Sequence, residues 1–186
     1  MGVLDRYKYS HTSWIETGTF LGKTTRYLAR TSPLVISLEP SPMHFSYAER
    51  RLKSLGNVHL LNVASENGLA HALGLVPSDC LCLWLDGHYS DGGTFLGIEE
   101  TPIRTELSIV KEWLNSKSGR KVAIFIDDVR CFGSQSNQGG SYPSLSELVR
   151  WADSLAMTWT IEHDIFVAKS DALVQPSPRN IPQKTA

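Results

Sequence analysis

Ser13-Trp-Ile-Glu-Thr-Gly-Thr-Phe-Leu-Gly-Lys-Thr-Thr25 is the stretch that decides the fold. Its apolar beginning predicts a short buried strand, and a helix is expected to start near Lys23. The two glycines between them, Gly18 and Gly22, allow the backbone to approach a bound molecule closely. Free N–H groups at a helix start also favour an anionic or polar ligand. The stretch therefore predicts a strand, a glycine turn and a helix that together cradle a ligand.

The glycine spacing leaves three kinds of ligand to compare. The phosphate loop of NTPases, G-x-x-x-x-G-K-[ST], is one residue longer than the segment from Gly18 to Thr24. The dinucleotide fingerprint G-x-G-x-x-G needs a glycine where Phe20 stands. A third interpretation starts from Glu16 at the strand end and from Glu39, 21 residues after Gly18, at the end of the next apolar run. That offset suits a carboxylate that binds the two hydroxyls of an adenosine ribose.

Acidic residues at two later strand ends support the third interpretation. The residues concerned are Glu16, Gly18, Thr19, Gly22, Glu39, Asp86, Asp127 and Asp128. In these residues the chain resembles the class I S-adenosylmethionine-dependent methyltransferases. It is most similar to the small metal-dependent O-methyltransferases, including the macrolide-sugar type, and also similar to the cephalosporin hydroxylase-like group. The resemblance spans about Trp14 to Lys169 and departs from the family at Leu21-Gly22, where a tighter glycine pattern is usual.

The resemblance implies that S-adenosylmethionine is the cofactor and that the glycine turn holds it. Glu16 is expected near the methionine part, Glu39 on the ribose, and Ser65-Glu66 beside the adenine. The full set of cofactor-binding residues expected on this basis is Glu16, Gly18, Thr19, Glu39, Ser65, Glu66 and Asp86.

The rest of the chain alternates apolar runs with amphipathic segments. Strands are expected at 34–39, 58–63, 80–86 and 121–127, helices around 45–55 and 103–114, and a closing hairpin at 158–162 and 165–168. Ser144 and Glu147 form a capping-box signature for a further helix, with Leu145, Leu148, Val149 and Ala152 on its apolar side. The alternation predicts an α/β fold: a single Rossmann-like, doubly wound, mainly parallel sheet with a C-terminal antiparallel hairpin, the class I methyltransferase fold. We expect one S-adenosylmethionine-binding, methyltransferase-like domain at 1–170 and a proline-containing flexible tail at 171–186.

The charge and composition of the chain limit the kinds of substrate and partner that are expected. The net charge of −1 over 186 residues provides no broad attraction for nucleic acid or membrane, so a small-molecule substrate is expected and a homo-oligomer is left open. No apolar run reaches about 18 residues and no signal segment is evident, which favours a cytoplasmic protein. Cys80, Cys82 and Cys131 are odd in number, so buried free thiols are favoured over disulfides or a zinc site.

Asp86 and Asp127 end two strands that should be neighbours, about 4.8 Å apart. Three carboxylates in one cleft, Asp86, Asp127 and Asp128, repel one another unless a cation neutralises them. Oxygen ligands suit Mg²⁺ or Mn²⁺. The alternative is that Asp127 caps a turn while Asp128 pairs with Arg130 on the surface.

His88, two residues after Asp86, is a candidate general base or metal ligand, although a loop histidine is often neither. The same question applies to His163 in the hairpin turn. Arg130 and Tyr142 lie on either side of the loop that follows the Asp127-Asp128 pair, at the carboxyl edge of the sheet. They are the candidates for substrate contact.

The function expected from these residues is methyl transfer to an oxygen of a small hydroxylated molecule, of sugar or natural-product type. The catalytic residues would be Asp86, His88 and Asp127, with the metal lowering the pKa of the hydroxyl. A rival is an NTP-binding phosphotransferase that uses Lys23 on phosphate and Asp127 on magnesium. A third interpretation is a non-catalytic binding module with the methyltransferase fold.

Overall fold

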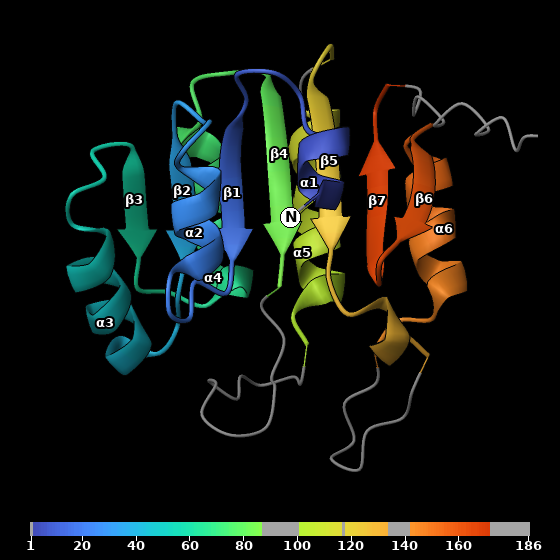
Figure 1. Ribbon diagram of the computed structural model, residues 1–186. Helices are drawn as coiled ribbons and strands as arrows, with labels where there is room; N and C mark the ends of the chain where they lie inside the picture. The colour runs from blue at the N-terminus through green and yellow to red at the C-terminus, as the bar shows by residue number, and fades with distance from the viewer. Residues whose placement is uncertain (1, 87–100, 117, 134–141, 172–186) are drawn as a thin grey trace, which may run out of the picture.

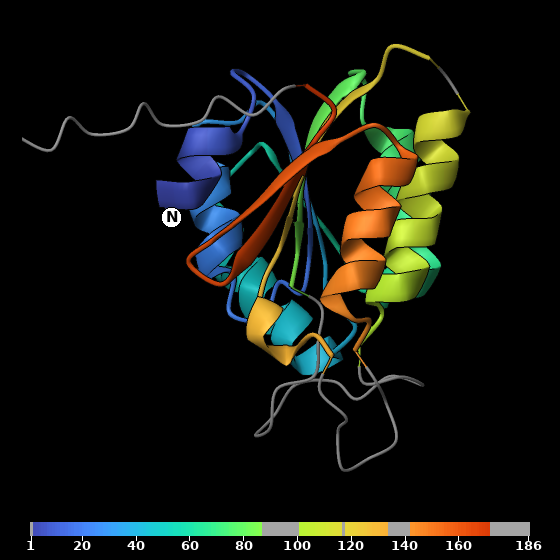
Figure 2. The same ribbon diagram turned by 90° about the vertical axis from the view of Figure 1, so that its right-hand side faces the viewer.

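The computed structural model describes residues 2–86, 101–116, 118–133 and 142–171. In this part of the chain, a seven-stranded sheet lies between two layers of helices (Figures 1 and 2). The strands are β1 (Ser13–Thr17), β2 (Val35–Leu38), β3 (Val58–Leu61), β4 (Cys80–Leu85), β5 (Lys121–Ile126), β6 (Thr158–Glu162) and β7 (Ile165–Lys169). The expected strands and hairpin are therefore confirmed, with ends shorter by one or two residues in several cases.

The strand order is β3-β2-β1-β4-β5-β7-β6. The first five strands of the chain pair in parallel, whereas β7 runs antiparallel to both β5 and β6. The predicted fold class is thereby confirmed. The order reverses between β1 and β4, and in such sheets ligands bind in the crevice at that point, beyond the carboxyl ends of the strands.

Helices cover both faces of the sheet in the part of the chain that the structure describes (Figure 2). The helices are α1 (Gly2–Tyr7), α2 (Lys23–Leu28), α3 (Pro42–Leu52), α4 (Ser65–Leu75), α5 (Ile103–Asn115) and α6 (Leu145–Ser154), with a 3-10 turn, η1, at Val129–Cys131. Helices α1 to α3 lie on one face and α4 to α6 on the other. The residues of α1 show no clear periodicity in the sequence, yet Val3, Leu4 and Tyr7 are buried there and Arg6 pairs with Glu162 at 2.6 Å.

The core has two halves because side chains alternate across each strand. Ile15, Leu83 and Ile124 face the side of α4 to α6. Trp14 and Phe125 face the other side and stack, with ring centroids 5.3 Å apart. Strands that are apolar on both faces are typical of a parallel sheet covered by helices, so the continuous apolar runs in the sequence follow from this architecture.

Two details of the helix predictions need correction. The capping box of Ser144 and Glu147 is present, but Leu145 is 38% exposed and lies off the apolar side, whereas Leu148 and Ala152 are buried. The helix expected around 45–55 begins earlier, at Pro42, and the buried residue of its first turn is His44. Both differences arise at the first turn of a helix.

The cysteines are free thiols, as expected, with Cys82 buried and Cys80 and Cys131 half-buried. Among the described residues, none of the helices is both long and apolar enough to span a bilayer. The tail at 171–186 lies outside the described residues apart from Asp171, and the single domain at 1–170 stays a prediction.

Candidate active site

The turn between β1 and α2 has the backbone of a glycine cradle. Gly18 and Gly22 have φ values of 85° and 68°, and Phe20 between them also has a positive φ of 47°. The N–H of Gly18 donates to the carbonyl of Leu38 at 3.0 Å, which holds the turn against the end of β2. A side chain at Gly22 would also contact Leu52 of α3 at 2.9 Å. Gly22 is therefore required for packing against α3, while Gly18 and the 46% exposed Phe20 are the parts of the turn near solvent.

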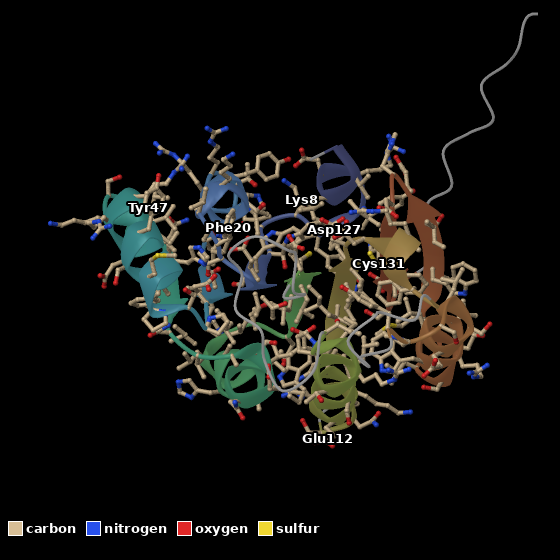
Figure 3. All side chains as sticks on the ribbon, turned by 90° about the horizontal axis from the view of Figure 1, so that it is seen from below. Lys8, Phe20, Tyr47, Glu112, Asp127 and Cys131 are labelled. Carbon is tan, nitrogen blue, oxygen red and sulfur yellow. The ribbon has the colours of Figure 1, made fainter. Side chains whose placement is uncertain are left out.

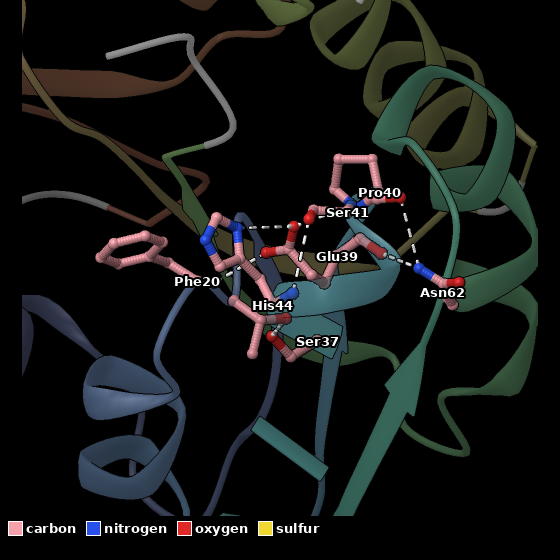
Figure 4. Close-up of polar contacts among 8 residues, drawn as sticks. Phe20, Ser37, Glu39, Pro40, Ser41, His44 and Asn62 are labelled. Atoms are coloured by element: carbon pink, nitrogen blue, oxygen red, sulfur yellow. Dashed lines mark hydrogen bonds and ion pairs between the residues drawn. The ribbon is translucent and has the colours of Figure 1, made fainter. Parts of the chain in front are cut away.

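Glu39 joins this turn to the segment that follows β2 (Figure 4). Its Oε2 accepts the N–H of Phe20 at 2.7 Å, and its Oε1 accepts the N–H of Ser41 at 2.9 Å. His44 Nδ1 lies 3.9 Å from the same Oε1, and Asn62 Nδ2 donates to the Glu39 carbonyl at 2.7 Å. A carboxylate has about four acceptor positions, so ribose hydroxyls would share Glu39 with two backbone groups. The sequence did not predict this second, structural task of Glu39.

Glu16 lies beneath the turn and is fully buried. Its Oε2 accepts hydroxyl bonds from Thr25 at 2.6 Å and Ser37 at 2.5 Å, and Thr19 is hydrogen-bonded to Ser37 at 2.6 Å. Burial raises the pKa of Glu16 to about 7 against the pull of the two hydroxyls. Its Oε1 has no hydrogen-bond partner among the described residues. Glu16 thus supports the turn from within.

Asp86 and Asp127 follow the paired ends of β4 and β5. Leu85 is opposite Ile126 in the ladder, so the two acids come next on adjacent strands. Burial is the largest cause that raises the pKa of Asp86, to about 8, followed by the charges of Asp127 and Asp128. The two acids therefore follow neighbouring strand ends, and their convergence on one ligand stays a prediction. Figure 3 looks onto this edge of the sheet, where Asp127 lies on the same side of the molecule as Phe20.

The contacts of Asp128 are those of the alternative without a metal ion, in which Asp127 caps a turn and Asp128 pairs with Arg130. Asp128 has a φ of 57°, and its N–H donates to Asp127 Oδ1 at 2.9 Å. Arg130 is ion-paired with both Asp128 and Asp164. No group of three or more His, Cys, Asp or Glu side chains is placed to hold a metal ion within the residues that the structure describes. The metal ion therefore stays a prediction, and Arg130 has acidic partners of its own.

A buried acid that the sequence interpretation missed, Glu106, lies on α5. It is 1% exposed, and burial raises its pKa to about 7. With Ile103, Leu107 and Val110, it occupies the buried stripe of the helix. A charged residue at that spacing on an apolar face is a signal that could have revealed it. Glu106 and Tyr142 line one small cavity together with Asp127.

The remaining candidates are His88, His163, Ser65 with Glu66, and Lys23. His88 lies outside the described residues, so its role stays a prediction. His163 is an exposed turn residue 3.8 Å from Glu162. Ser65 is buried at the first residue of α4 and hydrogen-bonded to Glu66 at 3.4 Å, at the same edge as the glycine turn. Lys23 is exposed at the start of α2, as expected for a solvated residue.

Comparison with known proteins identifies the fold of the chain but does not assign it to a family. No family model matches the sequence, and none of the curated proteins does. Solved structures do match. An rRNA methylase from Streptococcus thermophilus is 18% identical with a TM-score of 0.53, and the match covers 90% of this chain and 91% of that one. A candidate rRNA methylase from Clostridium thermocellum is 10% identical with a TM-score of 0.59, covering 90% and 92%.

A third similar structure contains a ligand. It is a candidate methyltransferase from Streptococcus mutans in complex with S-adenosylhomocysteine, 13% identical with a TM-score of 0.53, covering 87% of this chain and 89% of that one. At such low identities the likeness establishes the fold alone. The chain therefore has the fold of these methyltransferase structures over nearly its whole length.

Proposed function

We propose that this chain is an S-adenosylmethionine-dependent methyltransferase. The observation that supports this most directly is the arrangement at one edge of the sheet. There, the glycine turn of β1 is tied to Glu39, and the Asp86–Asp127 pair lies beside it at the point where the strand order reverses. The shared fold with structures named as methyltransferases agrees with it.

The residues of the cradle fit the cofactor chemically. Gly18 carries no side chain where the backbone must approach a ligand, and Glu39 has lone pairs for ribose hydroxyls. Ser65 and Glu66 at the start of α4 would flank the adenine. The unpartnered Oε1 of Glu16 and the carboxyl of Asp86 would lie toward the cationic methionine part. When bound, S-adenosylmethionine supplies an electrophilic methyl group.

Asp127 and Asp86 would then act on the acceptor. A carboxylate within hydrogen-bond reach of an acceptor hydroxyl orients its oxygen and takes its proton as the methyl group is transferred. The raised pKa of Asp86 allows that group to hold a proton near neutral pH. We propose Asp127 as the acceptor of the proton and Asp86 as the neighbour that shares it.

The finer part of the proposal is metal-assisted O-methylation of a small hydroxylated molecule. A Mg²⁺ or Mn²⁺ ion between Asp86 and Asp127 would lower the pKa of the acceptor hydroxyl, with waters or substrate oxygens as further ligands. RNA is the alternative substrate, because two of the similar structures are named as rRNA methylases. An assay that offers both hydroxylated small molecules and RNA distinguishes the two.

Calorimetric titration with S-adenosylhomocysteine and, separately, with ATP and Mg²⁺ tests the proposal. We expect saturable binding of S-adenosylhomocysteine and none of ATP. Tight, magnesium-dependent ATP binding without S-adenosylhomocysteine binding would instead favour the phosphotransferase. Methyl transfer from labelled S-adenosylmethionine then separates an enzyme from a binding module.

A further inference from the structure

Charge is distributed unevenly over the chain. Residues 20–57, which include α2 and α3, contain six basic and two acidic residues and so carry a net charge of +4. Because the whole chain carries −1, the remaining residues carry −5. All six basic residues are exposed, and they are Lys23, Arg26, Arg30, Arg50, Arg51 and Lys53. The two acids are Glu39, which is buried, and Glu49. The near-neutral total therefore includes a positively charged surface over α2 and α3, which we call the α2–α3 surface.

The cations of the α2–α3 surface form no ion pair with any residue that the structure describes. Several other basic side chains do form ion pairs, such as that of Arg6 with Glu162. Lys23 is also the first residue of α2, where the helix dipole disfavours a cation and where the first turn contains no acid. Neither ion pairing nor helix stabilisation explains this charge, whereas an anionic partner does.

Exposed aromatic rings lie among these cations. Phe20 is 46% exposed at the turn before α2, and Tyr47 is 42% exposed on α3. Because Tyr47 comes three and four residues before Arg50 and Arg51, its ring and their guanidinium groups share one side of the helix. Figure 3 shows Tyr47, Phe20 and Asp127 in that order across the carboxyl edge of the sheet. The exposed rings thus extend from the α2–α3 surface toward the proposed methyl-transfer site.

A single strand of nucleic acid is the partner that fits both features. Its phosphates are neutralised by Lys and Arg side chains, and its unpaired bases stack on aromatic rings. An anionic membrane would fit the charge, but a helix that lies in a membrane needs a large exposed apolar face. In α3 the apolar residues Ala48 and Leu52 are instead buried within the protein. The surface therefore favours nucleic acid over a membrane.

We propose that the α2–α3 surface binds a single strand of RNA, with phosphates on its arginines and lysines and bases on Tyr47 and Phe20. The inference deepens the proposed function and rests on it, because RNA, unlike DNA, has a 2′-hydroxyl on which Asp86 and Asp127 can act. Of the two acceptors considered for that function, it favours RNA. β2 and β5 are three strand spacings apart, roughly 14 Å. A strand that crosses this distance connects the α2–α3 surface to the acceptor side of the site.

The test measures the fluorescence anisotropy of a short labelled single-stranded RNA with the full chain at several salt concentrations. We expect saturable binding that weakens with salt, with a slope of log K against log salt of about −0.7 for each phosphate contact. Duplex RNA, whose bases are paired, and DNA of the same sequence should bind more weakly. Salt-independent binding, or equal binding of duplex and single strand, would overturn the RNA surface. Equal binding of DNA would overturn the choice of RNA, and binding of phosphatidylserine vesicles without RNA binding would assign the surface to a membrane.

Variants of exposed residues locate the contact. Arg50→Gln combined with Arg51→Gln should weaken RNA binding about tenfold and reduce the salt slope by about 1.4. Lys111→Gln combined with Arg150→Gln removes the same charge from α5 and α6, on the other face of the sheet, and should change neither. Equal losses in the two double variants would show that net charge alone matters and would contradict the proposal. Tyr47→Leu removes a ring without removing charge, so it should weaken binding about fivefold at an unchanged slope. Unchanged RNA affinity in Tyr47→Leu would count against base stacking on this surface.

Calorimetric titration of the same samples with S-adenosylhomocysteine separates this inference from the proposed function. Wild-type protein that binds S-adenosylhomocysteine but not RNA overturns the RNA surface alone. Wild-type protein that binds RNA in the expected manner but does not bind S-adenosylhomocysteine overturns the cofactor assignment and retains the surface.

Discussion

The backbone N–H of Phe20 lies 2.7 Å from Oε2 of Glu39. This bond connects the glycine turn after β1 to the acid at the end of β2, which are the two parts of the site expected to hold a cofactor from opposite sides. The other oxygen of Glu39 accepts the N–H of Ser41. Glu39 therefore stabilises the backbone of the cradle in addition to giving it a negative charge.

The first prediction is therefore that Glu39→Ala affects both cofactor binding and stability. Bonds to a charged acceptor are worth about 1.5–3 kcal/mol each. Loss of those to ribose should weaken S-adenosylhomocysteine binding at least about tenfold in calorimetry. Loss of those to Phe20 and Ser41 should lower the melting temperature. Glu49→Ala, an exposed acid on α3, is the control and should change neither. Unchanged affinity in a folded Glu39→Ala protein would remove Glu39 from the cofactor site.

The second prediction concerns the pH dependence of stability through Glu16. Its pKa is about 7 in the folded protein, against a reference value of 4.5 that applies to the unfolded chain. The folded state therefore binds more protons than the unfolded state between pH 4.5 and 7. The contribution of Glu16 to the free energy of unfolding is fully present below about pH 4.5 and is lost as the pH rises through about 7. At 1.36 kcal/mol per unit, the loss is about 3 kcal/mol.

Urea denaturation of wild-type protein and Glu16→Gln at pH 4.5, 6 and 8 measures that loss. The variant should show a flatter pH dependence of the free energy of unfolding than the wild type over this range. Parallel curves for the two proteins would show that Glu16 does not change its proton occupancy on folding. Glu162→Gln provides a control, because Glu162 is an acid at the surface ion pair with Arg6.

The sequence predicted the sheet well because its central strands, β1, β2, β4 and β5, are largely buried on both faces and end at or just before a polar residue. It also placed Asp86 opposite Asp127, since strand ends meet at one edge. It could not predict the bonds from Phe20 and Ser41 to Glu39, because these depend on a positive φ at Phe20 and on the path of the turn. Glu106 was missed although its spacing with Ile103 and Val110 places an acid on a buried face.

The third prediction compares two glycines of α4. A side chain at Gly68 would lie 2.4 Å from Val63 Cγ1 and 2.9 Å from Leu38 Cδ2, whereas the space at Gly74 is open. Alanine is favoured over glycine in a helix by about 0.5–1 kcal/mol. Gly74→Ala should therefore raise the free energy of unfolding by about that amount, and Gly68→Ala should lower it by about 1–3 kcal/mol through overpacking.

Thermal and urea denaturation of the two variants measure these opposite changes. Since both substitutions replace the same residue type in one helix, the propensity gain is common to them. If Gly68→Ala were as stable as Gly74→Ala, α4 would not pack against β2 as closely as the structure shows.

The last prediction decides whether the strand-end acids bind a metal. The pKa of Asp86 is about 8, raised first by burial and then by Asp127 and Asp128. Asp127→Asn removes one of those charges, so the pKa of Asp86 should fall while burial keeps it above 3.8. A bound divalent cation would lower the same pKa much further, because it favours the charged carboxylate directly. Carbon-detected NMR titration of the Asp86 carboxyl, with and without millimolar Mg²⁺, distinguishes the two situations. A pKa that moves with Asp127→Asn but not with Mg²⁺ would establish the acid pair and eliminate the metal, and proton removal from the acceptor would then depend on Asp127 itself.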